Sequence, residues 1–162
     1  NIVTASGNLV IRYKDYVFTA DEMEYREDEG IARFQGNVIV LYGEESKICA
    51  DEIMLYIREE MLIATSEGEE RVYVKTAEIQ AYAVKLEYGM ETGKLVMEEN
   101  VNVVSGDISA ECEKLEATED LLVLSGNPIV YQNARRFSAD EIFVYVEEKR
   151  IVARGNSRVL IE

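Results

Sequence analysis

Carboxylates are the residues of this chain with the clearest potential for chemistry, because they recur at a regular spacing. An Asp-Glu step follows alanine at Ala20-Asp21-Glu22, Ala50-Asp51-Glu52 and Ala139-Asp140-Glu141. Stacked carboxylates could bind Ca²⁺, but the sequence has no Asp-x-Asp-x-Asp-Gly loop and no glycine-aspartate nonapeptide to organise such a site. We therefore expect these side chains to cap backbone donors at a corner and to face water, and we predict no metal site.

The residues that most enzyme classes need are missing. The chain has no histidine, no Gly-x-Ser-x-Gly turn and no glycine loop that could cradle a phosphate. An acidic pair of the kind that glycoside hydrolases use stays open, although none of the 32 acidic residues is singled out. Cys49 and Cys112 have no second cysteine or histidine nearby, so we expect two packed thiols. The prediction is a non-enzymatic protein without a cofactor.

Charge narrows the choice of partners. The net charge is −15, which disfavours a general attraction to nucleic acid or to anionic lipid surfaces, and we predict no nucleic-acid partner. The pair Arg135-Arg136, directly before Phe137, could bind a lipid phosphate; the alternative is a strand edge that is solvated and protected by charge. No apolar run approaches the roughly 18 residues of a membrane-spanning helix.

The elements that position these residues repeat along the chain. A Gly-Asn step occurs at Gly7-Asn8, Gly36-Asn37, Gly126-Asn127 and Gly155-Asn156, with degenerate forms at Gly68-Glu69 and Glu99-Asn100. The Ala-Asp-Glu step lies between these markers, and its weaker forms are Ala83-Val84-Lys85 and Ala110-Glu111-Cys112. Two interleaved markers predict one domain over residues 1–162, built from about five stacked two-strand repeats of about 30 residues, anchored near positions 7, 36, 68, 99, 126 and 155.

Alternating apolar residues predict the strands. Val38, Val40 and Tyr42 show the period of two that is typical of a half-buried strand. This alternation changes phase at the Ala-Asp-Glu step, so we expect a β-bulge or a sharp corner there. Pro128 follows a Gly-Asn step and would remove a ladder hydrogen bond, which also indicates an edge or a bulge.

These patterns together resemble a known family. The order Gly-Asn-Val-x-Val, then Ala-Asp-Glu-x-x-x-Tyr, then a turn, is similar to the OstA-like domain of the lipopolysaccharide-transport system, which includes LptA, LptC and the periplasmic part of LptD. The resemblance extends from Gly7-Asn8 to Gly155-Asn156 and is strongest over residues 36–57 and 126–146. It implies an all-β, open-ended OstA-like β-jellyroll, in which two facing antiparallel sheets enclose an apolar groove for the acyl chains of a glycolipid.

The resemblance also implies a function and a site. We expect a periplasmic lipopolysaccharide or glycolipid transport protein, or an outer-membrane assembly protein, that joins related domains edge to edge and could form head-to-tail homo-oligomers. Any secretory signal is expected to be absent from this chain. The candidate groove residues are the inward-facing apolar residues of every repeat: Ile11, Phe18, Met23, Phe34, Val38, Val40, Ile53, Leu55, Leu86, Val101, Val103, Leu124, Phe137, Ile142 and Val144.

Two other functions are compatible with the same residues. The alternative to lipid transport is a structural β-solenoid scaffold of the cell envelope, in which these side chains form a closed core without a ligand. A carbohydrate-active β-helix is the third possibility. Lipid bound to the natively purified protein would distinguish the transport function from the scaffold.

Overall fold

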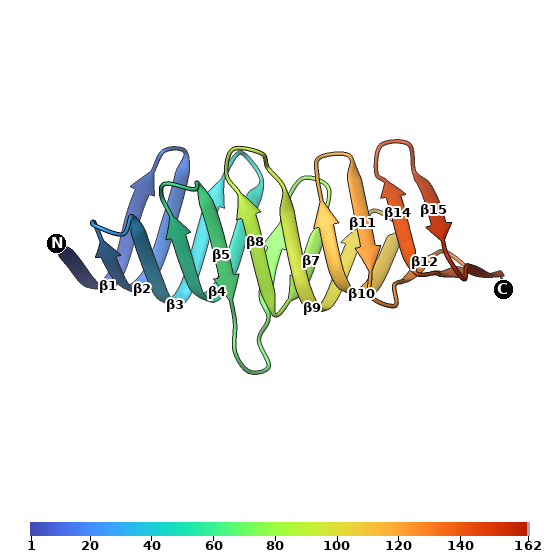
Figure 1. The fold of residues 1–162 in the computed structure, drawn as a ribbon, viewed down its shortest axis with the longest axis horizontal. Coiled ribbons are helices and arrows are strands. Elements are labelled where there is room, and N and C mark those ends of the chain that lie inside the picture. Colours follow the sequence, from blue (N-terminus) through green and yellow to red (C-terminus); the bar gives the residue numbers. More distant parts are fainter. Residues whose placement is uncertain (162) are drawn as a thin grey trace.

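The computed structural model describes residues 1–161, and these residues form an elongated all-β molecule with its two termini at opposite ends (Figure 1). Within this part of the chain there is no helix, and therefore none that could cross a membrane. The first eight strands are β1 (Ile2–Tyr13), β2 (Tyr16–Arg26), β3 (Ile31–Tyr42), β4 (Ser46–Tyr56), β5 (Met61–Thr65), β6 (Val72–Lys75), β7 (Gln80–Ala83) and β8 (Lys85–Gly89). The remaining strands are β9 (Leu95–Ser105), β10 (Ile108–Ala117), β11 (Leu121–Ser125), β12 (Ile129–Gln132), β13 (Arg135–Ser138), β14 (Glu141–Tyr145), β15 (Arg150–Arg154) and β16 (Arg158–Ile161).

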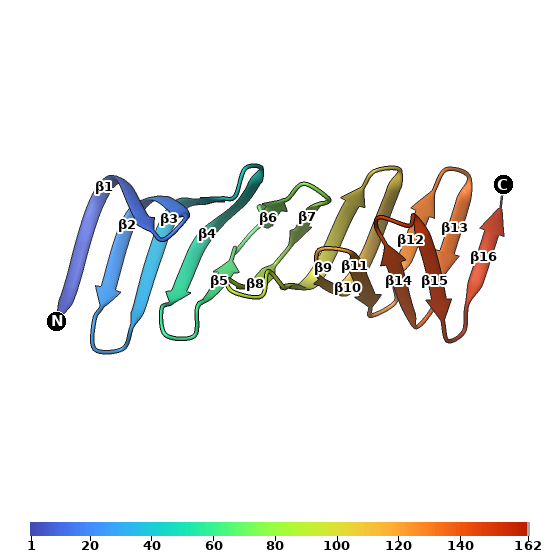
Figure 2. The same cartoon turned by 90° about the horizontal axis from the view of Figure 1, so that it is seen from above.

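The strands form two facing sheets because the long strands bend in the middle and contribute one half to each sheet. Sheet 1 has eleven strands in the order β1-β2-β3-β4-β5-β8-β9-β10-β11-β14-β15. Sheet 2 contains the other halves of the long strands and has the order β1-β2-β3-β4-β6-β7-β9-β10-β12-β13-β16. All neighbours are antiparallel, and Figure 2 shows the two sheets separating to opposite sides of the molecule. The all-β jellyroll with two antiparallel sheets is therefore confirmed.

The bend is formed by the two repeated markers, which lie opposite each other on neighbouring strands. Between the pairs Gln35↔Glu52 and Val38↔Ala50, the two residues Gly36 and Asn37 oppose Asp51 alone. Both residues have positive φ, +82° for Gly36 and +47° for Asn37, which is the left-handed conformation that glycine and asparagine tolerate best. The predicted corner is confirmed, but the extra residue of the bulge lies in the Gly-Asn step rather than in the Asp-Glu step. We call this line of bends the hinge.

The degenerate repeats keep the hinge with different residues. Glu99 and Asn100 have φ values of +68° and +54°, so they adopt the Gly-Asn conformation without glycine. The assignment of Ala110-Glu111-Cys112 as the second marker was wrong, because the register shift lies between Cys112 and Lys114 and Glu113 therefore occupies the corner. Residues 110–112 still alternate regularly within β10, and alanine alone does not mark the corner. Pro128 is buried in the break between β11 and β12, as expected for a bulge.

Apolar side chains fill the space between the sheets as one continuous cluster. It contains Phe18 and Phe34 near the N-terminal end, where the rings stack with centroids 4.6 Å apart, and it continues through Met97 to Val144 near the C-terminal end. Because side chains alternate along each strand, every strand contributes residues to this interior. The two sheets thus share one core, and each repeat depends on its neighbours for burial.

Candidate functional site

The structure brings all fifteen predicted groove residues together in the interior cluster. Twelve of them are at most 3% exposed, and the other three, Ile11, Met23 and Phe137, are half-buried and pack against the same cluster. Their side chains contact one another across the space between the sheets, so the interior is filled by the protein itself. The fifteen residues therefore face the interior, and a lipid groove lined by them stays a prediction.

The side of the molecule opposite the hinge, which we call the mouth, is where turns of the two sheets face each other. Three tyrosines meet there from different strands: Tyr16 at the start of β2, Tyr42 at the end of β3 and Tyr88 in β8. The Tyr16 hydroxyl lies 3.3 Å from the Tyr88 hydroxyl and 3.4 Å from the Met90 carbonyl oxygen. The Tyr42 ring lies 5.4 Å from the Tyr16 ring and 5.0 Å from the Tyr88 ring, measured between centroids. Since Tyr88 belongs to sheet 1 and the other two to sheet 2, the cluster bridges the mouth.

An ion pair bridges the mouth beside the tyrosines. Lys14, in the turn between β1 and β2, donates to the carboxylate of Glu60, in the turn between β4 and β5. Burial is the main cause that raises the pKa of Tyr16 and Tyr42, so both hydroxyls stay protonated at neutral pH. We call Tyr16, Tyr42, Tyr88, Lys14 and Glu60 the clasp, because they hold the two sheets together over the N-terminal half of the mouth.

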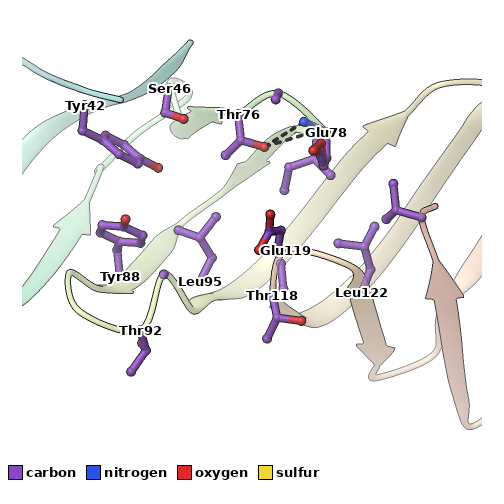
Figure 3. A pocket seen from close by; sticks show the side chains of 15 residues that line it. Tyr42, Ser46, Thr76, Glu78, Tyr88, Thr92, Leu95, Thr118, Glu119 and Leu122 are labelled. Carbon is purple, nitrogen blue, oxygen red and sulfur yellow. Dashed lines mark hydrogen bonds between the residues drawn. The ribbon is translucent and has the colours of Figure 1, made fainter. Parts of the chain in front are cut away.

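A cavity of about 320 Å³ opens between the sheets immediately beyond the clasp. Tyr42 and Tyr88 belong to both the clasp and the cavity, and Figure 3 shows them at one end of the cavity, with Leu95 beside Tyr88 and Leu122 toward the far end. Its polar lining consists of the side chains of Ser46, Thr76, Glu78, Thr92, Thr118 and Glu119. No lysine or arginine lines the cavity. Its volume is at the lower end of the range of small-ligand sites.

The Tyr42 hydroxyl gives the cavity an unsatisfied polar group. The oxygen is fully buried and has no hydrogen-bond partner among the described residues. Ser46 is a neighbour of this hydroxyl but makes no hydrogen bond of normal geometry with it. A buried donor without a partner is costly, so the Tyr42 hydroxyl destabilises the closed mouth.

The residues that line the cavity at the mouth were not predicted from the sequence. None of the fifteen predicted groove residues lines the cavity, because those residues lie deeper, on the strands, whereas the cavity is lined mainly by strand ends and turns. The available signal was a tyrosine at the end of a strand, as at positions 16, 42 and 88. That signal becomes specific only when the fold shows which strand ends face each other.

The other candidate residues have structural roles. Asp51 accepts a hydrogen bond from the backbone N–H of Glu67 at 3.2 Å, which is the expected capping role, and Asp140 accepts one from the Asn156 amide at 3.1 Å. The side chains of Arg135 and Arg136 lie on opposite faces of β13, since neighbours in a strand alternate. Arg135 donates to Gln132 at 2.7 Å, so the two arginines do not form a joint phosphate site.

Both cysteines are packed thiols. They are free cysteines, and Cys112 is buried whereas Cys49 is half-buried. Burial is the main cause that raises the pKa of Cys49, and it raises the pKa of Cys112 to about 12. Neither thiol has the depressed pKa of a reactive cysteine.

Comparison with known proteins gives a family and a structural relative. The family described as LptA/(LptD N-terminal domain) LPS transport protein matches residues 18–120, more than half of the chain. The fold is similar to that of LptH, the LptA-homologous periplasmic component of the lipopolysaccharide transport device of Pseudomonas aeruginosa, with a TM-score of 0.51 and 14% sequence identity. That likeness covers 91% of this chain and 94% of LptH. No curated protein sequence matches the chain. The chain belongs to the LptA/LptD N-terminal domain family of lipopolysaccharide transport proteins.

Proposed function

We propose that this protein is a periplasmic, non-enzymatic carrier that accommodates the acyl chains of lipopolysaccharide or a related glycolipid between its two sheets. The observation that supports the proposal is the continuous apolar cluster, which extends between two open-ended sheets from Phe18 to Val144. An acyl chain needs an apolar path without interruption and no charged group, and this interior supplies one.

The gross energy of acyl-chain burial exceeds the cost of opening the clasp. Transferring about 14 methylene groups from water, at about 0.8 kcal/mol each, contributes about 11 kcal/mol before the costs of binding. The hydrogen bonds of Tyr16 and the pair between Lys14 and Glu60 stabilise the closed mouth by about 1 kcal/mol each. The clasp is therefore weak enough for a lipid to displace it, while the hinge keeps the two sheets connected.

The cavity beside the clasp is the proposed point of access. It lies beyond the clasp, and its lining combines hydroxyl groups with the buried side chains of Leu95 and Leu122. An acyl chain would displace apolar contacts inward of the cavity, while the head group stays at the mouth. The unsatisfied Tyr42 hydroxyl would bind a polar group of the ligand near the start of the acyl chain.

Both ends of the molecule support edge-to-edge association with related domains. The first and last strands leave one row of backbone groups unpaired, and Ile2 and Ile161 are 59% and 72% exposed there. Each sheet has an odd number of antiparallel strands, so its first and last strands run in the same direction. A second domain stacked in line, with its mouth on the same side, would therefore pair its β1 with β15 and β16 in parallel.

Lipid analysis of the purified protein tests the proposal. The protein would be purified natively from an envelope that contains lipopolysaccharide, extracted with organic solvent and analysed by mass spectrometry. We expect about one glycolipid or fewer per chain in the wild type and a strong loss in Ala77→Trp, which fills the cavity from an exposed turn. Ala134→Trp is the matched control, because Ala134 is exposed in the corresponding turn between β12 and β13 and does not line the cavity.

The scaffold without a ligand is the competing function, and the dense packing of the interior favours it. Protein that is free of lipid under these conditions, in both the wild type and Ala134→Trp, would support the scaffold and reject the carrier. Equal lipid in Ala77→Trp and the wild type would retain the carrier but reject the cavity as the point of access.

A further inference from the structure

The outer face of sheet 2 differs in composition from the rest of this acidic protein. Two rows of outward-facing residues cross all eleven strands, one from Val10 to Arg158 and the other from Arg12 to Leu160. We call these 22 positions the basic face. They include five cationic residues and a single acidic one, Glu111, although the whole chain has nearly twice as many acidic as basic residues. The cations are Arg12, Lys47, Lys75, Arg136 and Arg158.

The outer face of sheet 1 provides an internal comparison. Its two equivalent rows, from Ser6 to Arg154 and from Thr4 to Val152, also contain 22 positions. These hold seven acidic and four basic residues and six apolar or aromatic ones, whereas the basic face holds eleven apolar or aromatic residues. Acidic residues are thus concentrated on the outer face of sheet 1, whose longer strands also carry a third outward row from Ile2 to Arg150.

The large exposed apolar side chains are also concentrated on the basic face. Apart from the two terminal strands β1 and β16, the large apolar or aromatic side chains that are exposed in residues 1–161 all lie on the basic face: Ile39, Leu41, Tyr82, Val104 and Tyr131. Val104 is 50% exposed and Leu41 is 47% exposed. Contiguous exposed apolar residues of this kind mark interaction surfaces more often than scattered ones do.

The cations of the basic face are also unpaired. None of the five forms an ion pair with a carboxylate of residues 1–161, and Lys47 instead lies over the Tyr73 ring, 5.8 Å from its centroid. On sheet 1, by contrast, Lys85 and Lys114 each lie within 3.5 Å of a carboxylate oxygen. Unpaired cations beside exposed apolar groups suit a partner that is anionic and partly apolar.

We propose that the basic face docks on an anionic lipid head-group layer, an interaction that is separate from lipid carriage in the interior. The cations lie toward the two ends of the face, on β1, β4 and β6 and again on β13 and β16, whereas the central strands β7, β9, β10 and β12 carry none. A head-group layer can contact the neighbouring Lys47 and Lys75 together, with the tyrosines and aliphatic side chains beside them at the level of the head groups.

The net charge of −15 does not prevent this contact. The acidic outer face of sheet 1 is directed away from a layer that contacts sheet 2, and packed sheets are about 10 Å apart. Acidic residues border the basic face on both sides: Asp15, Glu44, Glu45, Glu78 and Asp107 in the turns at the mouth, and Asp21, Asp51, Glu113 and Asp140 at the hinge. The face therefore needs both its cations and its apolar residues to bind, and neither alone is sufficient.

Vesicle flotation tests the docking. The wild type should float with vesicles of phosphatidylcholine and phosphatidylglycerol in a one-to-one ratio and not with phosphatidylcholine alone. Binding should weaken at about 1 M salt, where the Debye length is about 3 Å. Lys47→Glu/Lys75→Glu should lower the partition coefficient about tenfold or more, because each cation near an anionic surface contributes to binding. Leu41→Ser/Val104→Ser should also lower it.

Lys85→Glu/Lys114→Glu is the matched control, since it changes the net charge equally on the other face and should bind vesicles like the wild type. Equal losses in the two charge-reversal variants, or no flotation of the wild type, would overturn the proposal. Self-association of the wild type that is lost in Lys47→Glu/Lys75→Glu, without vesicle binding, would instead assign the face to a second copy. Lipid extracted from the interior should be unchanged in these variants, so the carrier proposal is tested separately.

Discussion

Substitution of the hinge glycines gives the sharpest test of how the repeat markers shape the fold. Gly7 and Gly36 have nearly the same φ, +91° and +82°, but different surroundings. A Cβ on Gly7 would meet no atom within 4 Å, whereas a Cβ on Gly36 would lie 2.5 Å from Asp21 Oδ2 and 2.8 Å from Asp21 Cβ. The two sites therefore separate the cost of the backbone conformation from the cost of the close approach.

The magnitudes follow from these contacts. Gly7→Ala should lower the free energy of unfolding by about 1 kcal/mol, the cost of positive φ offset in part by the lower entropy of the unfolded chain. Gly36→Ala should lose about 1–3 kcal/mol more, because overpacking adds strain of that size. Rotation of the Asp21 side chain cannot relieve the contact with its own Cβ, so the backbone of β2 must move.

Urea unfolding measured by circular dichroism would give these free energies. Asp21→Gly should recover about 1 kcal/mol or more of the loss in Gly36→Ala, and Asp21→Ala, which keeps the Cβ, should recover little. Equal losses for Gly7→Ala and Gly36→Ala, or equal recovery by both Asp21 variants, would refute the packing of the two markers against each other.

Three further predictions concern buried polar groups. Tyr42→Phe should leave the free energy of unfolding unchanged or raise it by about 1 kcal/mol, while lowering glycolipid affinity; a large loss of stability would show that the hydroxyl has a partner. Burial raises the folded-state pKa of Tyr16 and Tyr42, so the stability that their neutral forms contribute is present below pH 10 and is lost as the pH rises above it. In urea titrations at alkaline pH, Tyr16→Phe/Tyr42→Phe should show a smaller decrease of the free energy of unfolding with pH than the wild type. Cys112 should resist a thiol reagent at pH 8 until urea unfolds the protein, and rapid labelling of the native protein would contradict its burial.

The hinge and the interior could be predicted from sequence because both depend on local patterns. Gly36-Asn37 and Asp51 have residue types that suit a bulge, and alternation identifies Val38 and Val40 as inward-facing without knowledge of their partners. The position of the hinge was misassigned at residues 110–112, where no Asp-Glu step is present and the corner is formed by Glu113.

The mouth and the basic face could not be predicted because they depend on which strands are neighbours. Tyr16 and Tyr88 are 72 residues apart in sequence, and only the stacking of the repeats brings their hydroxyls together. Lys47 and Lys75 likewise become cross-strand neighbours through the pairing of β4 with β6. Net charge, moreover, is a sum over the whole chain and does not reveal that the two outer faces differ.

The central claim, that acyl chains occupy the interior, is tested most directly by photo-cross-linking. Protein with photo-leucine in place of leucine would be loaded with glycolipid in vesicle-free solution, irradiated and mapped by mass spectrometry. We expect lipid adducts at Leu86 and Leu124, which are fully buried between the sheets, and none at Leu41, which is 47% exposed on the outer face. Adducts confined to Leu41, or no adducts at all, would contradict the account.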